Sequence, residues 1–212
     1  MSEGSIDPDV DPLVMYLVVR RRTARPFGEL AAAAALATRR CALRFREDER
    51  WREGFDDWWR HSFRKVCLRA EPREWEDVRL LDHERVGDVA CLPPIRRLAR
   101  ERVLVRMQAL ADPAGVLPSV GVAGAPGLTL VVRTDLGMSA GKMVAQIGHG
   151  ALMAGLDSTL EVGVSLRVVG AGTEDWARLA PTADAIVRDG GLTEIEPGSE
   201  TVLVLWRGEL LG

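Results

Sequence analysis

The tetrapeptide Leu-Val-Val-Arg occurs twice in this chain, at residues 17–20 and 130–133. Each copy ends an apolar run rich in β-branched residues, which predicts a buried strand. A loop and a helix-forming stretch follow each time, Glu29–Leu43 in the first case and Lys142–Ala154 in the second. Because the two strand–loop–helix units recur 113 residues apart, they predict an α/β fold that contains an internal repeat.

Further segments extend the repeat. Three pairs of stretches match in the same order, first strand-like, then helix-like with one tryptophan, then strand-like: 64–69 with 164–168, 74–81 with 174–180, and 103–107 with 202–206. The last pair reads VLVRM and VLVLW and is offset by 99 residues. A tryptophan-rich, charged stretch at 44–60 predicts one more amphipathic helix in the first copy. Its aromatic and arginine residues could also stack on bases, but a helix that buries its tryptophans is the commoner case and is preferred.

The repeat and its connections predict four parts of the chain. They are a disordered acidic tail at 1–11, a first copy at 12–110, a linker rich in Pro, Gly and Ala at 111–127, and a second copy at 128–212. Two similar units can pack through equivalent apolar surfaces, as the subunits of a symmetric dimer do. We therefore expect a monomer in which the first copy takes the place of a second subunit.

Several features predict a cytoplasmic location. No run approaches the roughly 18 apolar residues of a membrane span, and the acidic start of the chain lacks the pattern of a secretory signal. The three cysteines are odd in number and far apart, which favours buried free thiols over disulfides or a zinc site. The three histidines are scattered as well, so no metal site is expected.

The second copy presents two stripes of side chains on its first helix. Met143, Ile147, Ala151 and Ala154 recur at helical spacing and predict a buried face. Lys142, Gln146, His149 and Met153 form a second stripe. Because the N–H groups at a helix N-terminus lack partners within the helix, this strand–loop–helix unit is a candidate place to hold an anion.

Two motifs in the second copy closely resemble the signature of the type 2 peptidyl-tRNA hydrolases. The first comprises Val131, Val132, Arg133, Asp135, Leu136, Met138, Gly141, Lys142, Ala145, Gln146 and His149. The second runs from Ile186 to Ile195 and continues with Pro197, Gly198, Ser199 and Thr201. The two motifs stand in the family's order and cover most of residues 128–206, so a chance match is improbable.

The resemblance implies a fold, a reaction and a set of residues. The family has a three-layer α/β/α unit with a mixed four-stranded sheet, forms homodimers, and hydrolyses the ester between peptide and tRNA in peptidyl-tRNA without a metal or another cofactor. By position in the motifs, the catalytic candidates are Asp189, Thr193, Thr201 and Lys142. The candidates for substrate binding in the same copy are Arg133, Asp135, Gln146 and His149; for the last two, a structural hydrogen bond is an equal alternative.

The sequence departs from the family pattern at Ala140. There the family usually has a lysine that is assigned a catalytic role, directly before the Gly-Lys pair represented here by Gly141 and Lys142. This departure favours an alternative function, a tRNA- or protein-binding module that retains the fold and turns over slowly or not at all. The Asp189, Thr193 and Thr201 set favours the enzyme.

The first copy lacks the polar motif but is rich in arginine. Residues 1–112 contain 22 of the 28 basic residues, balanced by 20 acidic ones. Arg20, Arg21, Arg22 and Arg25 follow the first strand, and Arg96, Arg97, Arg100 and Arg102 stand where the 99-residue offset places the Asp/Thr motif. We expect both groups at one end of the sheet, as a patch that binds the tRNA backbone. The alternative is that these arginines pair with local acids.

Overall fold

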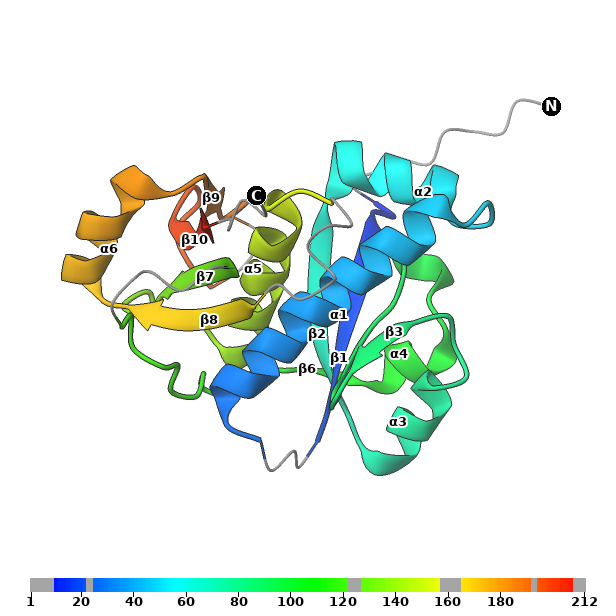
Figure 1. Ribbon diagram of the computed structural model, residues 1–212. Helices are drawn as coiled ribbons and strands as arrows, with labels where there is room; N and C mark the ends of the chain where they lie inside the picture. The colour runs from blue at the N-terminus through cyan, green and yellow to red at the C-terminus, as the bar shows by residue number, and fades with distance from the viewer. Residues whose placement is uncertain (1–9, 22–24, 122–126, 157–164, 192–193, 208–212) are drawn as a thin grey trace.

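The computed structural model describes residues 10–21, 25–121, 127–156, 165–191 and 194–207. It confirms the α/β class: each half of the chain builds its own sheet, and both sheets mix parallel with antiparallel strands (Figure 1). Most of the predicted tail, residues 1–9, lies outside the described residues.

The sheet of the first half has the order β3-β4-β1-β2-β6, and β5 pairs with the start of β1. Its strands are β1 (Leu13–Arg20), β2 (Arg64–Ala70), β3 (Glu84–Val86), β4 (Val89–Cys91), β5 (Ile95–Arg96) and β6 (Gln108–Ala109). Its helical segments are α1 (Phe27–Glu47), α2 (Arg52–Asp57), the π-helical turn η1 (Trp58–Ser62), α3 (Pro72–Val78), the 3-10 turn η2 (Arg97–Ala99) and α4 (Arg102–Arg106).

The sheet of the second half has the order β8-β7-β10-β9. Its strands are β7 (Gly127–Arg133), β8 (Leu166–Ala171), β9 (Ala185–Arg188) and β10 (Glu200–Arg207), and its helical segments are α5 (Ala140–Met153), α6 (Thr173–Leu179) and the 3-10 turn η4 (Ala180–Thr182). Strand β7 is parallel to β8 and antiparallel to β10, as β1 is parallel to β2 and antiparallel to β4. The two halves thus share a strand order, while internal duplication itself stays a prediction.

One predicted strand is wrong. Of the predicted strand at 103–107, residues 103–106 lie in helix α4 and Met107 ends it. The element that pairs with β1 as β10 pairs with β7 is the short strand β4. Val103, Leu104 and Met107 are buried while Val105 is 56% exposed, which is helical rather than alternating spacing. The 99-residue offset is therefore wrong, and the 113-residue offset that relates Val19 to Val132 also relates Val89 to Val202.

Both faces of each sheet are covered. Strand β1 alternates its side chains, so that Met15 and Leu17 pack with α1 whereas Tyr16 and Val18 pack with α3 and α4. In the second half, one face of the sheet packs with α5 and the other with α6. The predicted three-layer arrangement stays an interpretation of this packing.

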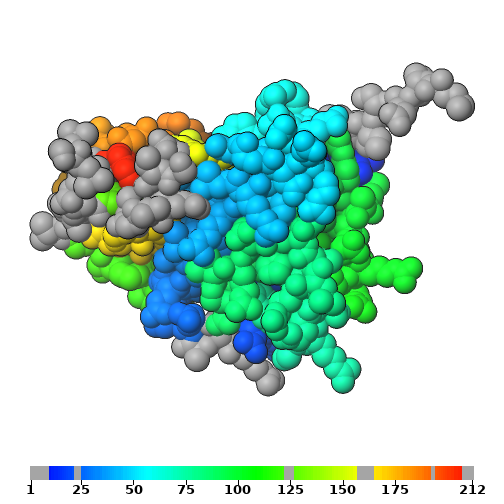
Figure 2. Space-filling model, turned by 45° about the vertical axis from the view of Figure 1, so that its right-hand side comes forward, coloured from blue at the N-terminus to red at the C-terminus, as the bar shows by residue number. Residues whose placement is uncertain are grey.

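Helices α1 and α5 join the two halves (Figure 1). The alanine-rich α1 contributes Ala34 and Ala37 to the core of its own half and Ala31 and Ala35 to the core of the other. Small side chains on α1 allow the two helices to approach closely. The buried Arg39 of α1 donates a hydrogen bond at 2.8 Å to the carbonyl of Ala151 near the end of α5. Figure 2 shows the halves in direct contact.

The first part of the predicted linker packs against both halves. Leu117 is buried, and bridges connect Pro113 to Ser139 and Ser119 to Gly170 of the second half. Gly115 lies against Phe27 of the first half, because an added Cβ would come within 2.5 Å of the Phe27 Cβ. A Cβ atom on Gly141 would lie 2.3 Å from the carbonyl oxygen of Leu110, so this close approach requires glycine. Residues 122–126 of the predicted linker lie outside the description.

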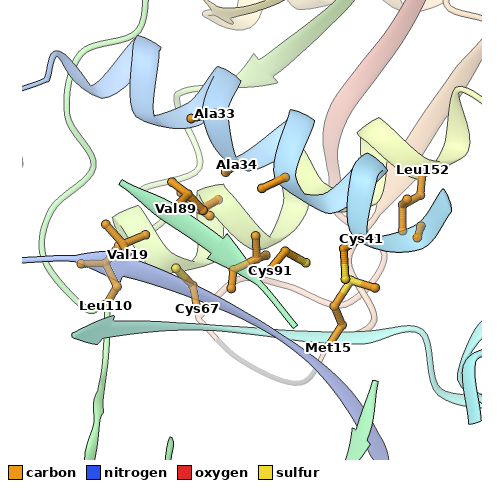
Figure 3. Packing of buried hydrophobic residues seen from close by; sticks show 14 of the residues in the cluster. Met15, Val19, Ala33, Ala34, Cys41, Cys67, Val89, Cys91, Leu110 and Leu152 are labelled. Carbon is orange, nitrogen blue, oxygen red and sulfur yellow. The ribbon is translucent and has the colours of Figure 1, made fainter. Parts of the chain in front are cut away.

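The three cysteines meet in the core of the first half. Cys41, Cys67 and Cys91 come from α1, β2 and β4, are buried, and carry free thiols, as predicted (Figure 3). Burial raises the pKa of the Cys41 thiol, and the neighbouring Cys91 raises it further. Within the described ranges, no helix combines the length and hydropathy that crossing a membrane requires.

Candidate active site

Ser139 starts helix α5 and orients its polar stripe. The Ser139 side chain accepts a hydrogen bond from the backbone N–H of Lys142 at 3.2 Å, which is an N-cap interaction. Met143, Ile147 and Ala151 then face the core of the second half. Lys142, Gln146, His149 and Met153 all line one cavity, so the stripe predicted from helical spacing is confirmed.

Asp189 is the most enclosed carboxylate of this cavity. It follows β9 directly, and its side chain is 3% exposed. One carboxylate oxygen accepts hydrogen bonds from the Lys142 ammonium and, at 2.9 Å, from the Gln146 amide. The other accepts the Gly191 backbone N–H at 3.0 Å. An ionised carboxylate has roughly four lone-pair positions, so the donors among the described residues leave one acceptor position for water or substrate.

Thr201 supports this arrangement from strand β10. The Thr201 hydroxyl is buried and donates to the Gln146 side-chain oxygen at 2.8 Å, which directs the Gln146 amide group toward Asp189. Four of the predicted residues, Lys142, Gln146, Asp189 and Thr201, thus form one hydrogen-bonded chain. Thr193 lies outside the described residues.

The start of α5 is not an open anion site, contrary to the expectation from its sequence. The backbone N–H of Ala140 donates to the carbonyl of Asp112, and that of Gly141 donates to the carbonyl of Leu110, both at 2.8 Å. The next N–H, of Lys142, is occupied by the Ser139 side chain. The chain segment that leaves the first half therefore fills the place that a phosphate would need.

Ala140 belongs to the contact between the halves. Its side chain is 5% exposed and packs in the same cluster as Leu110 and Val144. The position at which the family usually has a lysine therefore faces a packed surface rather than the cavity in this chain.

The cavity has a volume of about 950 Å³ and is lined by both halves. One wall holds Asp189 and the stripe of α5, and the opposite wall comes from η1, β2 and β6 of the first half. The first-half wall presents the cationic side chains Arg64, Lys65 and Arg97 together with the aromatic side chains Trp59 and Phe63.

Lys65 and His149 meet across this cavity. The Lys65 Nζ lies 2.9 Å from the His149 Nδ1 and 3.9 Å from the centre of the Phe63 ring. Burial lowers the pKa of the Lys65 ammonium well below its usual range. Burial also lowers the pKa of His149, and the positive charges of Lys65 and Lys142 lower it further. The imidazole is therefore neutral at pH 7.

Arg133 and Asp135 stand apart from the Asp189 cluster. Arg133 donates to Asp135 at 3.0 Å, and Asp135 also accepts from Thr173 at the start of α6 at 2.7 Å. Although burial opposes the effect, the hydrogen bonds from Thr173 and Arg133 lower the pKa of Asp135. Neither residue lines the cavity that contains Asp189.

The two groups of first-half arginines do not form one patch, which corrects the expectation from sequence. Arg20 ends β1, whereas Arg96 pairs with Leu13 at its other end. The eight-residue strand separates the groups by roughly 23 Å, because a strand rises about 3.3 Å per residue. Arg20, Arg21 and Arg25 form ion pairs with Asp88, Glu71 and Glu29, and none of the three lines the cavity; Arg22 lies outside the described residues.

Three residues of the site were missed from the sequence. Glu194 binds both the hydroxyl and the backbone N–H of Ser139, at 2.8 and 2.9 Å, and it stands inside the second motif, which was a usable signal. Lys65 and Trp59 belong to the other half. No local pattern connects Lys65 with residues on α5, and Trp59 lies in the stretch 44–60, whose aromatic and arginine residues allowed base stacking but were interpreted as a helix that buries its tryptophans.

Comparison with known proteins gives the relationship of the second half. Residues 127–162 match the family model described as peptidyl-tRNA hydrolase PTH2. A peptidyl-tRNA hydrolase of Methanocaldococcus jannaschii is 35% identical over 95 residues, which cover 37% of this chain and 83% of that protein. The chain belongs to the peptidyl-tRNA hydrolase 2 family.

Other members of the peptidyl-tRNA hydrolase 2 family show the same extent of similarity. A peptidyl-tRNA hydrolase of Thermococcus onnurineus is 37% identical over 93 residues, covering 36% of this chain and 79% of that protein. The mitochondrial peptidyl-tRNA hydrolase 2 of Mus musculus is 34% identical over 106 residues, covering 42% of this chain and 59% of that protein. No solved structure shows a significant match. In each relative, the aligned region covers less than half of this chain.

No group of three or more His, Cys, Asp or Glu side chains within the described part of this family member is arranged to hold a metal ion. The arrangement around Asp189 instead combines a carboxylate, an ammonium and an amide, which are groups suited to proton transfer and to the stabilisation of negative charge.

Proposed function

We propose that this protein hydrolyses the ester bond between the peptide and the terminal ribose of peptidyl-tRNA. The observation that carries the proposal is the position of Asp189, held by Lys142, Gln146 and a backbone N–H on the wall of a large cavity. The membership of the peptidyl-tRNA hydrolase 2 family supports the substrate class.

The proposed chemistry uses the acceptor position of Asp189 that no described residue occupies. A water molecule hydrogen-bonded there is oriented and made more nucleophilic by the carboxylate. Its oxygen adds to the ester carbonyl carbon, the bond from that carbon to the ribose oxygen breaks, and the water proton ends on the ribose hydroxyl. The products are a free peptide and free tRNA. Lys142, beside the carboxylate, stabilises the negative charge that develops on the carbonyl oxygen.

Replacement of Asp189 with Asn tests this function. The amide is similar in size but cannot take a proton from water, so release of free tRNA should slow by about a hundredfold to ten-thousandfold. The measurement is turnover of purified peptidyl-tRNA by the full chain. Asp175→Asn serves as the matched control, because Asp175 is a hydrogen-bonded carboxylate of the same half outside the cavity. Full activity of Asp189→Asn would remove Asp189 from the mechanism.

A binding module without turnover is the second candidate, and Ala140 favours it. The lysine that the family usually has at this position is replaced by a buried alanine at the contact between the halves. If the wild-type chain binds tRNA but releases no peptide under any tested condition, the binding function replaces the enzymatic one.

A further inference from the structure

Lys65 extends from the first half to a helix of the second. It lies on β2, beside Met15 of β1, and its side chain reaches α5. A Cβ atom on Gly148 would come within 3.2 Å of the Lys65 Cδ, so the missing side chain of Gly148 makes room for the lysine stem. The stem ends at His149, on the stripe of α5 that lines the cavity.

The environment of the Lys65 ammonium contains aromatic rings and no carboxylate among the described residues. Its Nζ lies 3.9 Å from the centre of the Phe63 ring and 4.8 Å from that of Trp58, and its polar contact is the His149 ring nitrogen. A desolvated ammonium without a carboxylate partner destabilises a folded protein. Such a group is common where a protein binds an anionic ligand, since the ligand then supplies the missing charge.

The position of Lys65 relative to the reacting groups indicates what it binds. His149 follows Lys142 by seven residues, which places the Lys65 contact roughly 10 Å along α5 from the residue that holds Asp189. This distance is too great for contact with the scissile ester and suits a more distant part of a bound nucleic acid.

Trp59 adds a second group suited to nucleic acid. It is 39% exposed, lines the same cavity, and stacks on Phe55 with ring centres 6.1 Å apart. An exposed aromatic ring beside cations is the combination that binds single-stranded nucleic acid, because bases stack on the ring while the cations contact phosphates.

We propose that the first half completes the site by holding the single-stranded 3′ end of tRNA, with Lys65 contacting a backbone phosphate and Trp59 stacking on a base. This inference rests on the proposed function for its substrate. It assigns substrate positioning to the wall formed by η1 and β2, in place of the arginines at the far end of β1.

The pH dependence of binding gives one readout. The titratable or charged groups around Lys65 are His149 on α5, Cys41 on α1, Cys91 on β4 and the adjacent Arg64. Since the protonated amine contacts phosphate, tRNA affinity should fall as pH rises through the lowered pKa of Lys65. In Lys65→Arg the charge persists at higher pH, so this fall should disappear.

The decisive experiment measures binding and cleavage separately in the full chain. Probes are deacylated tRNA for binding at several salt concentrations, and an acylated aminoacyl-adenosine ester, which lacks phosphate, for cleavage. Lys65→Met should weaken tRNA binding by about tenfold and reduce the salt slope by about one contact, and leave ester cleavage unchanged. Lys65→Arg keeps the positive charge and should retain tRNA binding. Trp59→Ala should weaken tRNA binding roughly tenfold.

Arg79→Met is the matched control, because Arg79 is an exposed cation that follows α3, on the other face of the first sheet, and is paired with Glu76. It should leave tRNA binding unchanged. Unchanged binding in Lys65→Met, or equal losses of tRNA binding and ester cleavage, would overturn the inference. A wild-type protein that cleaves no ester would contradict the proposed hydrolysis. The binding assay needs no turnover, so it would still test the role of Lys65.

Discussion

The two halves share a strand order and differ in one connection. In the second half, 14 residues separate Val187 of β9 from Val202 of β10, and they include Asp189 and Thr201. In the first half, two residues separate Val86 of β3 from Val89 of β4. Where the second half has the connection that carries the polar site, the first half has a tight turn at Gly87, which has a positive φ of 56°.

This difference shows how the chemistry is separated from the scaffold. Paired strands and covering helices depend on alternating apolar residues, which both halves retain. The polar groups are on a connection and on one stripe of a helix, and the sheet of the first half forms without such a connection. With the 113-residue offset, Lys142, Gln146 and His149 of the polar stripe correspond to Glu29, Ala33 and Leu36 of α1.

The largest expected effect on stability is at Gly141, where the segment that contains Leu110 passes over the start of α5. Gly141→Ala places a methyl group 2.3 Å from the Leu110 carbonyl oxygen, so the backbone must move and the N–H contacts of the helix start are lost. We expect the free energy of unfolding to fall by about 3 kcal/mol, measured by urea denaturation.

Gly54→Ala is its control in the first half. Gly54 lies in α2 with no atom within 4 Å of an added Cβ, so alanine should be neutral or stabilise by about 0.5–1 kcal/mol. Equal effects of the two substitutions would mean that the crossing at Leu110 does not hold the halves together.

The second effect concerns Ala140, where the family usually has a lysine. An added cation in the site would be expected to raise the rate, but the alanine is buried at the contact between the halves. Ala140→Lys should therefore lower the free energy of unfolding by about 2 kcal/mol without faster cleavage of peptidyl-tRNA. A faster and stable variant would show that the lysine reaches the cavity after all.

The smallest effect is expected for the arginines that follow β1. Each of Arg20, Arg21 and Arg25 is at least 43% exposed and paired with a local acid, and exposed pairs contribute little. Their combined replacement by Gln should change the affinity for deacylated tRNA by less than about twofold at 0.15 M salt. A tenfold loss of tRNA affinity would instead show that tRNA binds at this end of the first half.

The sequence by itself determined most elements and the family. Helical spacing correctly separated the buried face of α5 from the stripe of Lys142, Gln146 and His149, because burial imposes its period on a regular helix. The resemblance to the family's motifs likewise pointed to Asp189 and Thr201, which meet through Gln146. The same reasoning failed for residues 103–107, where five residues are too few to distinguish a strand from one helical turn.

Only the tertiary structure decided what covers each face. Lys65 and His149 are 84 residues apart, and their contact depends on how α5 of one half packs against β2 of the other. The same packing buries Ala140, occupies the start of α5 with the carbonyls of Leu110 and Asp112, and places two arginine groups at opposite ends of β1. The spacing of apolar residues along a helix or strand shows that one face is buried. Which segment covers that face depends on contacts between residues that are distant in sequence.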